Sequence, residues 1–153
     1  MRQLFGNRFK GTSLQPFHLA FPVKNLERAR AFYGNILGCQ QGREDPGVWI
    51  DFSLFGHQIV AHQVPVSHTA KVHSNHVDGH NVPVPHFGLV LKWKEYHEFV
   101  DMLKLNKVKF EIEPTIRFVG LPGEQATMFF YDSEGNALEF KAFKREGEIF
   151  KKH

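Results

Sequence analysis

PHFGLVL, at residues 85–91, is a short apolar run typical of a buried β-strand, yet it contains His86, which hydrocarbon packing does not require. Two other strand-like runs share this feature: PFHLAFPV contains His18, and ALEFKAF contains Glu139. Burying an ionisable group without a partner costs several kcal/mol or shifts its pKa until the group is neutral. Three such residues in three similar strands therefore indicate a shared role.

The composition indicates one soluble globular domain. The chain has 153 residues, of which 42% are hydrophobic and 14% aromatic, enough for a sizeable core. Its formal net charge is only +3, and Lys and Arg are spread along the chain, so we expect no nucleic-acid partner. The single cysteine, Cys39, cannot form an internal disulfide, and no apolar run approaches the length of a membrane helix or signal peptide. We therefore expect a cytoplasmic protein with no membrane partner.

The hydrophobic pattern occurs twice along the chain. In the first unit Asn25 fits a helix N-cap, Gly38 fits a left-handed C-terminal residue, and apolar residues recur at helical spacing between them. The strand patterns of this unit lie at 17–23, 39–43, 48–54 and 58–64. Those of the second unit lie at 86–93, 109–112, 124–131 and 137–143, with a helical stripe after the first. Each unit has the order β-α-β-β-β, so we predict an internal repeat.

The segment between the two units fits neither pattern. We divide a single domain, residues 1–153, into a module at about 16–64, a connecting loop at about 65–84, a module at about 85–143 and a tail at 144–153. The connecting segment contains His68, His73, His76 and His80 among Ser, Asn, Gly and Pro. Irregularly spaced loop histidines are poorly preorganised, so we expect a solvated loop there rather than a metal site.

Aligning the two units places His18 opposite His86, and Val60 opposite Glu139. If the first strands of both units lie near a pseudo-twofold axis, the two histidines face each other and Glu139 reaches the same point. Two imidazoles and one carboxylate leave coordination positions open, an arrangement typical of non-haem Fe(II) and also suited to Mn(II). Taken alone, a strand histidine is more often a hydrogen-bonded core or surface residue, and Glu139 can pair with Lys141. The matching repeat positions favour a shared divalent-metal site.

The sequence resembles the vicinal oxygen chelate superfamily, which includes glyoxalases, extradiol dioxygenases, fosfomycin-modifying thiol transferases, bleomycin-binding proteins and methylmalonyl-CoA epimerases. The similarity lies in FHLAFPVKNLERARAFYGNILGC, PHFGLVL and FFYDSEGNALEF, and the last is a specific signature. The resemblance implies an α+β fold in which two tandem βαβββ modules form a cupped mixed β-sheet cleft with helices outside. It also implies that His18, His86 and Glu139 are metal ligands, and that the chain forms a homodimer, sometimes with modules exchanged between chains. The sequence leaves that exchange open.

Val60 separates branches of this superfamily. Glyoxalases and epimerases usually place a fourth ligand at the position of Val60, and valine cannot bind a metal. The three-ligand pattern favours a dioxygenase-type oxidoreductase with Fe(II) that binds a small substrate, for example an aromatic one, through vicinal oxygens. Two alternatives stay open: a Mn(II)-dependent thiol transferase or lyase, and a small-molecule-binding resistance protein without catalysis.

Five residues are candidates for acid–base chemistry or substrate binding. His62 shares the strand face of Val60, and Tyr131 lies in the strand before Glu139, so either is a candidate acid or base. His62 can equally cap its strand, and Tyr131 can simply pack with its hydroxyl in water. We expect Gln58 and Val60 to line the substrate cleft, and Arg117 to hold a carboxylate or phosphate, although a loop arginine is usually only a solvated charge.

Overall fold

The structure of the protein, a computed structural model, describes residues 15–68, 72–77 and 79–151. The segment that precedes the first predicted module lies almost wholly outside the described residues. The elements of the first module are β1 (His18–Val23), α1 (Leu26–Arg30) continued by a π-helix (Ala31–Ile36), β2 (Gln40–Asp45), β3 (Trp49–Leu54) and β4 (His57–Gln63). Those of the second module are β7 (His86–Leu91), α2 (Trp93–Leu105), β8 (Phe110–Arg117), β9 (Gln125–Tyr131) and β10 (Ala137–Phe143). The predicted α+β fold of two βαβββ modules is confirmed.

Each module forms an open mixed sheet of four strands. The strand orders are β1-β4-β3-β2 and β7-β10-β9-β8, and in each sheet the first and last strands of the module pair in parallel. Ala20 pairs with Val60 in the first sheet, and Gly88 pairs with Glu139 in the second. The register therefore places Val60 at the position equivalent to Glu139, as the aligned repeats predict.

The first helix begins and ends at the predicted residues. Asn25 has an extended backbone, and its side chain accepts a hydrogen bond from the Arg28 amide at 2.9 Å, which satisfies one of the open donors of the first turn. Leu26 and Ala29 are buried on the face toward the sheet. Gly38 has φ of 69°, a conformation that glycine adopts without strain, so the chain turns there into β2.

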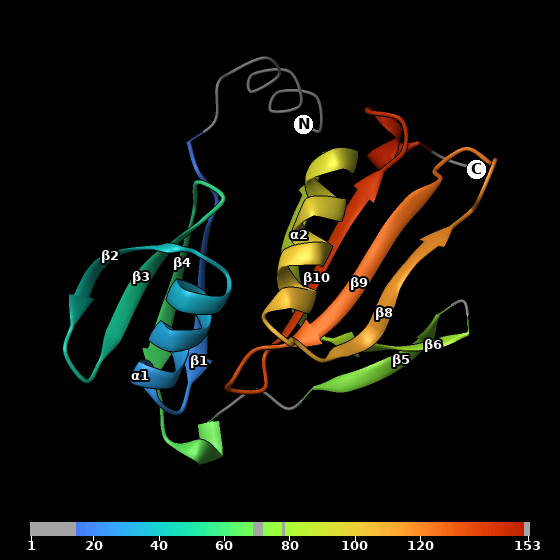
Figure 1. Ribbon diagram of the computed structural model, residues 1–153. Coiled ribbons are helices and arrows are strands. Elements are labelled where there is room, and N and C mark those ends of the chain that lie inside the picture. The colour runs from blue at the N-terminus through green and yellow to red at the C-terminus, as the bar shows by residue number, and fades with distance from the viewer. Residues whose placement is uncertain (1–14, 69–71, 78, 152–153) are drawn as a thin grey trace, which may run out of the picture.

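The two modules share one hydrophobic core. Side chains alternate along each strand, and the apolar faces of both sheets pack with both helices into a single cluster. Aromatic rings cross the module boundary, with centroid separations of 5.2 Å for Phe21 and Phe87 and 6.4 Å for Phe32 and Phe130. Figure 1 shows the two sheets side by side, each with its helix. The opposite faces of the sheets, which carry the predicted ligands, are turned away from this shared core.

A short turn of the second module fastens it to the first. The Tyr33 hydroxyl donates a hydrogen bond to Asp132 Oδ2 at 2.9 Å, and both side chains are buried. Glu134 Oε2 accepts from the backbone amides of Lys24 at 2.8 Å and Asn25 at 3.1 Å, directly before α1. The turn that contains Asp132 and Glu134, within the FFYDSEGNALEF segment, therefore also accepts hydrogen bonds from the backbone at the start of the first helix.

The connecting segment differs from the predicted loop. After a 3-10 turn at Val66–His68, it forms a two-stranded hairpin, β5 (His73–Val77) and β6 (His80–Val84), which lies below the second sheet in Figure 1. Nearly all of the hairpin residues are exposed, so the strands need no apolar alternation, the signal by which strands are recognised in sequence. His73, His76 and His80 are solvated, as expected.

The tail beyond β10 packs in part against the second module. A 3-10 turn at Glu148–Phe150 buries the Glu148 side chain, whose Oε2 accepts a hydrogen bond from the Gly123 amide at 2.7 Å. Phe150 is 88% exposed. In the described part of the tail, Glu148 thus packs against the second module, whereas Phe150 is exposed to solvent.

Candidate metal centre

His86 and Glu139 lie side by side on the exposed face of the second sheet. His86 Nε2 is 3.2 Å from Glu139 Oε2, and His86 Nδ1 is 2.6 Å from the carbonyl oxygen of Pro83. Since a carbonyl only accepts, Nδ1 carries a proton, and Nε2 is the nitrogen directed at the carboxylate. Metal-binding histidines show the same arrangement, in which the second ring nitrogen donates to a carbonyl or carboxylate.

The surroundings keep Glu139 ionised. Burial raises the pKa of its carboxyl, but hydrogen bonds from His86, Lys141 and Thr127 outweigh burial and leave the pKa below its ordinary value. Glu139 Oε1 accepts from Thr127 Oγ1 at 2.8 Å and lies 3.0 Å from Lys141 Nζ. The hydrogen bond to Glu139 raises the pKa of His86, although its burial opposes this. Both ring nitrogens of His86 face acceptors, so a divalent ion can replace the proton on Nε2.

Gly88 allows the strands that carry these two residues to meet. A Cβ atom added to Gly88 would lie 1.7 Å from the backbone oxygen of Glu139, well inside contact distance. A larger residue would force β7 and β10 apart. The alignment of His86 with Glu139 therefore depends on glycine at this position.

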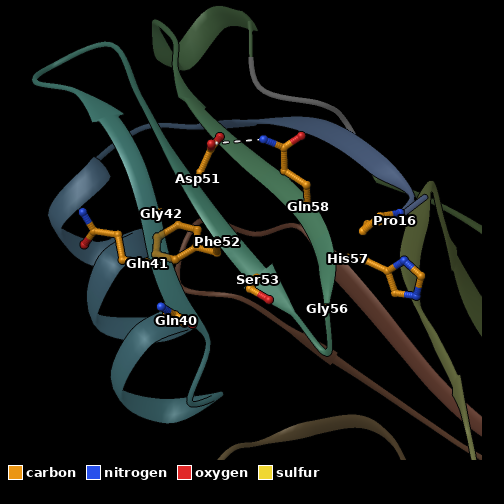
Figure 2. Close-up of a pocket in the computed structure, with 10 residues that line it drawn as sticks. All are labelled: Pro16, Gln40, Gln41, Gly42, Asp51, Phe52, Ser53, Gly56, His57 and Gln58. Atoms are coloured by element: carbon orange, nitrogen blue, oxygen red, sulfur yellow. Dashed lines mark hydrogen bonds between the residues drawn. The ribbon is translucent and has the colours of Figure 1, made fainter.

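His18 is held by a separate hydrogen-bonded chain on the exposed face of the first sheet. Gln58 Nε2 donates to Asp51 Oδ2 at 3.0 Å, as Figure 2 shows, so the amide oxygen of Gln58 faces His18. That oxygen lies 2.7 Å from His18 Nδ1, which must then be the donor. The lone pair on His18 Nε2 is thereby the one available to a metal. Gln58, predicted to contact substrate, is engaged with these two side chains.

Asp51 is the site residue that sequence reasoning missed. It is 7% exposed, and Arg43 Nη2 lies 3.4 Å from its Oδ2. The signal was present, because Asp51 is a lone carboxylate in the apolar strand WIDFSL, just as Glu139 is in ALEFKAF. The equivalent position in the second sheet is Phe129, which has no ligand atom, so the alignment of the two repeats does not point to Asp51.

The chain brings His86 and Glu139 together but does not bring His18 to them. Within residues 15–68, 72–77 and 79–151, no group of three or more His, Cys, Asp or Glu side chains is arranged to hold a metal ion. The cause is the shared core, because it turns the ligand-bearing faces of the two sheets outward. The assignment of the three ligands itself stays a prediction.

The remaining predicted residues lie at different distances from these two groups. His62 is half-buried on β4, four residues beyond Gln58 and hence roughly 13 Å along the strand from the His18 pairing. Tyr131 pairs with Ala137, next to His86, and burial, with Glu111 nearby, raises the pKa of its hydroxyl. This favours Tyr131 as a hydrogen-bond donor over a base.

Val60 and Arg117 complete the predicted set. Val60 is 5% exposed and lies on the same sheet face as Gln58, where it brings no donor atom toward His18. Arg117 ends β8, and its guanidinium carbon lies 5.2 Å from the centroid of the Phe118 ring. Arg117 is thus on the second sheet with His86, although not beside it.

The donor set fits a divalent cation. It consists of one carboxylate held ionised and two imidazoles, each with Nδ1 directed at an oxygen acceptor, and Nε2 of His86 lies beside the carboxylate. Hard and borderline divalent ions such as Fe(II) and Mn(II) accept this combination. The first sheet also carries a surface pocket of about 410 Å³ beside Asp51 and Gln58 (Figure 2), which leaves space next to His18.

Paired βαβββ modules with histidine and glutamate on their outer sheet faces define a protein of the glyoxalase fold. Residues 15–140 match the family model described as Glyoxalase/Bleomycin resistance protein/Dioxygenase superfamily, and the chain belongs to this superfamily. Its members typically use divalent metal ions. None of the helices in the described part of the chain is long and apolar enough to cross a bilayer.

Solved structures support this assignment. The chain is similar to a glyoxalase/bleomycin resistance protein/dioxygenase from Alicyclobacillus acidocaldarius, with 29% identity, a TM-score of 0.72, and coverage of 89% of this chain and 96% of that one. It shares the fold of lactoylglutathione lyase from Agrobacterium tumefaciens (17% identity, TM-score 0.62, 92% and 98% covered). It also shares that of the fosfomycin resistance protein FosX from Listeria monocytogenes (19% identity, TM-score 0.62, 90% and 98% covered). A comparison with curated proteins finds no match.

Proposed function

We propose that the protein is a divalent-metal-dependent enzyme of dioxygenase type whose site forms between two copies of the chain. In this arrangement one copy supplies His86 and Glu139 and the other supplies His18. The observation that supports the proposal is the preset orientation of both histidines. Each directs Nδ1 to an oxygen acceptor, which leaves Nε2 as the nitrogen for a metal, and among the described residues the two histidines do not share a cluster within one chain.

A dimer with twofold symmetry would bring His18 of one copy to His86 and Glu139 of the other. Rotation about a twofold axis can place the first-module face of one copy on the second-module face of the other, and the same rotation creates a second, identical contact. Each dimer then has two sites of two imidazoles and one carboxylate. Val90, on the His86 face, is 47% exposed in the single chain, which is consistent with a face that a partner covers.

The bound ion would act as a Lewis acid toward two adjacent oxygens of the substrate and, as Fe(II), would leave a position for O₂. The residues of the chain prepare this site. Thr127 and Lys141 hold Glu139 in place, Gln58 and Asp51 orient His18, and the Pro83 carbonyl orients His86. Lys141 also brings a positive charge next to the ligands, which would stabilise an anionic substrate oxygen.

Two other reaction classes, thiol transfer and lyase chemistry, can use the same three ligands. The fold is shared with proteins described as a lyase and as a fosfomycin resistance protein, so a Mn(II)-dependent thiol transferase or lyase is the second candidate. The absence of a donor at Val60 favours the three-ligand dioxygenase pattern. We place the enzyme in the cytoplasm, where Cys39, a buried thiol whose pKa burial raises to about 11, stays reduced.

Metal binding by protein purified without oxygen tests the proposal. We expect Fe(II) to bind with a stoichiometry of about one ion per chain, and Glu139→Ala to abolish that binding, because a ligand is lost. Glu146→Ala, at an exposed residue of the tail, is the matched control and should bind iron normally. Binding that survives Glu139→Ala would contradict the ligand set. Turnover with a thiol donor and without oxygen uptake would favour the transferase.

A further inference from the structure

The sheet face that carries His86 and Glu139 continues toward a second group of residues. Lys141 lies two residues beyond Glu139 on β10, so its side chain is on the same face, and it pairs with Val90 and Thr127. The next row along this face contains Phe143, Gln125 and Arg117. A substrate held at the metal ligands and lying along the strands would pass over Lys141.

A pocket of about 340 Å³ lies at this end of the face. Its apolar walls come from Val90, Phe118 and Phe143, with Ile149 from the tail. Its polar lining includes Gln125, Lys141 and Lys151. The volume is at the small end of the range for ligand pockets, enough for one or two rings.

The charges around the pocket are mainly positive. Lys141 and Lys151 line it, and Arg117 lies over the ring of Phe118, one of its walls. The carboxylate in the lining, Glu148, is paired with Lys151 of the same lining at 3.2 Å and with Arg145 outside it at 3.2 Å, and it accepts from the Gly123 amide at 2.7 Å. The cations therefore outnumber the anion, in a setting where apolar walls strengthen electrostatic interactions.

Lys141 connects the pocket to the candidate metal centre. Its Nζ is 3.0 Å from Glu139 Oε1, and its side chain is 30% exposed on the pocket side. A cation bound by Glu139 would compete with Lys141 for the carboxylate. The ammonium would then be available to an anion in the pocket.

We infer that the substrate of this site has an apolar body and an anionic group, and that Lys141 and the pocket between Phe118 and Phe143 bind that anionic end. The inference rests on the proposed function, because it takes the other end of the substrate to be bound at His86 and Glu139. Lys141 is thus a specificity-determining residue, and the preferred ligands are apolar carboxylates or phosphate esters rather than neutral aromatics.

The test uses metal-free protein and three matched probes: 2-naphthoate, 2-naphthyl phosphate and the neutral 2-naphthamide. Titration calorimetry should give binding of at least one anion that is about five- to tenfold tighter than binding of the amide. The anion that binds with the higher affinity indicates whether the substrate carries a carboxylate or a phosphate ester. Lys141→Met should remove the preference for anions, and Lys141→Arg should keep it. Glu139→Gln should increase the preference, because the uncharged glutamine side chain no longer competes for Lys141.

Lys144→Met is the matched control, because Lys144 Nζ lies 4.5 Å from the Trp93 ring rather than in the pocket. It should leave the preference unchanged. Equal affinity for 2-naphthamide and both anions in the Glu139→Gln variant, where Lys141 is released from the carboxylate, or an anion preference that persists in Lys141→Met, would overturn the inference. Amide resonances of Gln125 and Val90 that do not shift on adding naphthoate would also overturn it. Because no metal is present, these outcomes are independent of whether the metal site of the proposed function forms.

Discussion

The side-chain oxygen of Gln58 lies 2.7 Å from Nδ1 of His18 and fixes which nitrogen of the ring faces outward. Gln58→Leu keeps the size of the side chain but removes this acceptor. We expect the affinity for a divalent ion to fall about tenfold, as is usual when the orienting partner of a metal-binding histidine is lost. The melting temperature should fall modestly, because the contact with His18 is exposed but Asp51, 7% exposed, loses a donor. Titration with Mn(II) measures the effect.

The control for this variant is Gln63→Leu, which changes an exposed glutamine at the other end of the same strand. It should bind Mn(II) like the wild type. If Gln58→Leu also binds like the wild type, Gln58 does not orient a ligand.

Gly88→Ala tests the close pairing of β7 with β10. The added Cβ would meet the Glu139 backbone oxygen, so the strands must separate. We expect a loss of about 2 kcal/mol in unfolding free energy, or roughly 4–8 °C in melting temperature, together with weaker metal binding. Gly34→Ala is the control, because a Cβ there has no atom within 4 Å and the residue is helical. Equal melting temperatures for the two variants would contradict the strand geometry.

Metal binding should depend on pH through His86. The hydrogen bond to Glu139 raises the pKa of His86 above its ordinary 6.5, so metal-free protein keeps the proton on Nε2 to a higher pH than an ordinary histidine does. A metal must displace that proton, and affinity should fall as pH drops through the raised pKa. Calorimetry in buffers of different ionisation enthalpy should detect more proton release on binding at about pH 6.5 than at about pH 8.5. Proton release that does not change between these two pH values would contradict this account.

Glu134→Ala tests the fastening of the two modules. The Glu134 carboxylate accepts from the amides of Lys24 and Asn25, lies 3.0 Å from Arg28 Nε, and is fully buried. Its removal leaves two partly buried amides without this acceptor and Arg28 without its ion pair, so we expect a cost of about 2–4 kcal/mol in unfolding free energy. Denaturant unfolding measures this, with Glu146→Ala as an exposed control. A cost below about 0.5 kcal/mol would show that the turn does not hold the modules together.

Much of the fold could be predicted from the sequence, because most strands of the modules bury one face. The alternation in ALEFKAF predicted β10 with its correct bounds and placed Glu139 opposite the core. Asn25 and Gly38 marked the ends of the first helix because their side-chain and backbone chemistry is local. The pairing of His86 with Glu139 followed from the same alternation and the repeat.

Other features depend on contacts that no local pattern encodes. The β5–β6 hairpin is exposed on both faces and has no apolar alternation. The separation of His18 from His86 depends on how the modules pack, through rings such as Phe21 and Phe87. A repeat in sequence specifies two equivalent strands, but it does not specify whether their ligand faces meet in one chain or across two.

Metal binding by mixed dimers tests the central claim most directly. Chains carrying His18→Ala and chains carrying Glu139→Ala can be co-expressed with different tags and purified as hybrids. A site shared between copies predicts that each parent dimer binds no Mn(II) with wild-type affinity, whereas the hybrid binds about one ion per two chains, because one of its two sites is intact. A hybrid that binds no more Mn(II) than its parents, or a wild-type protein that binds one ion per chain as a monomer, would contradict it.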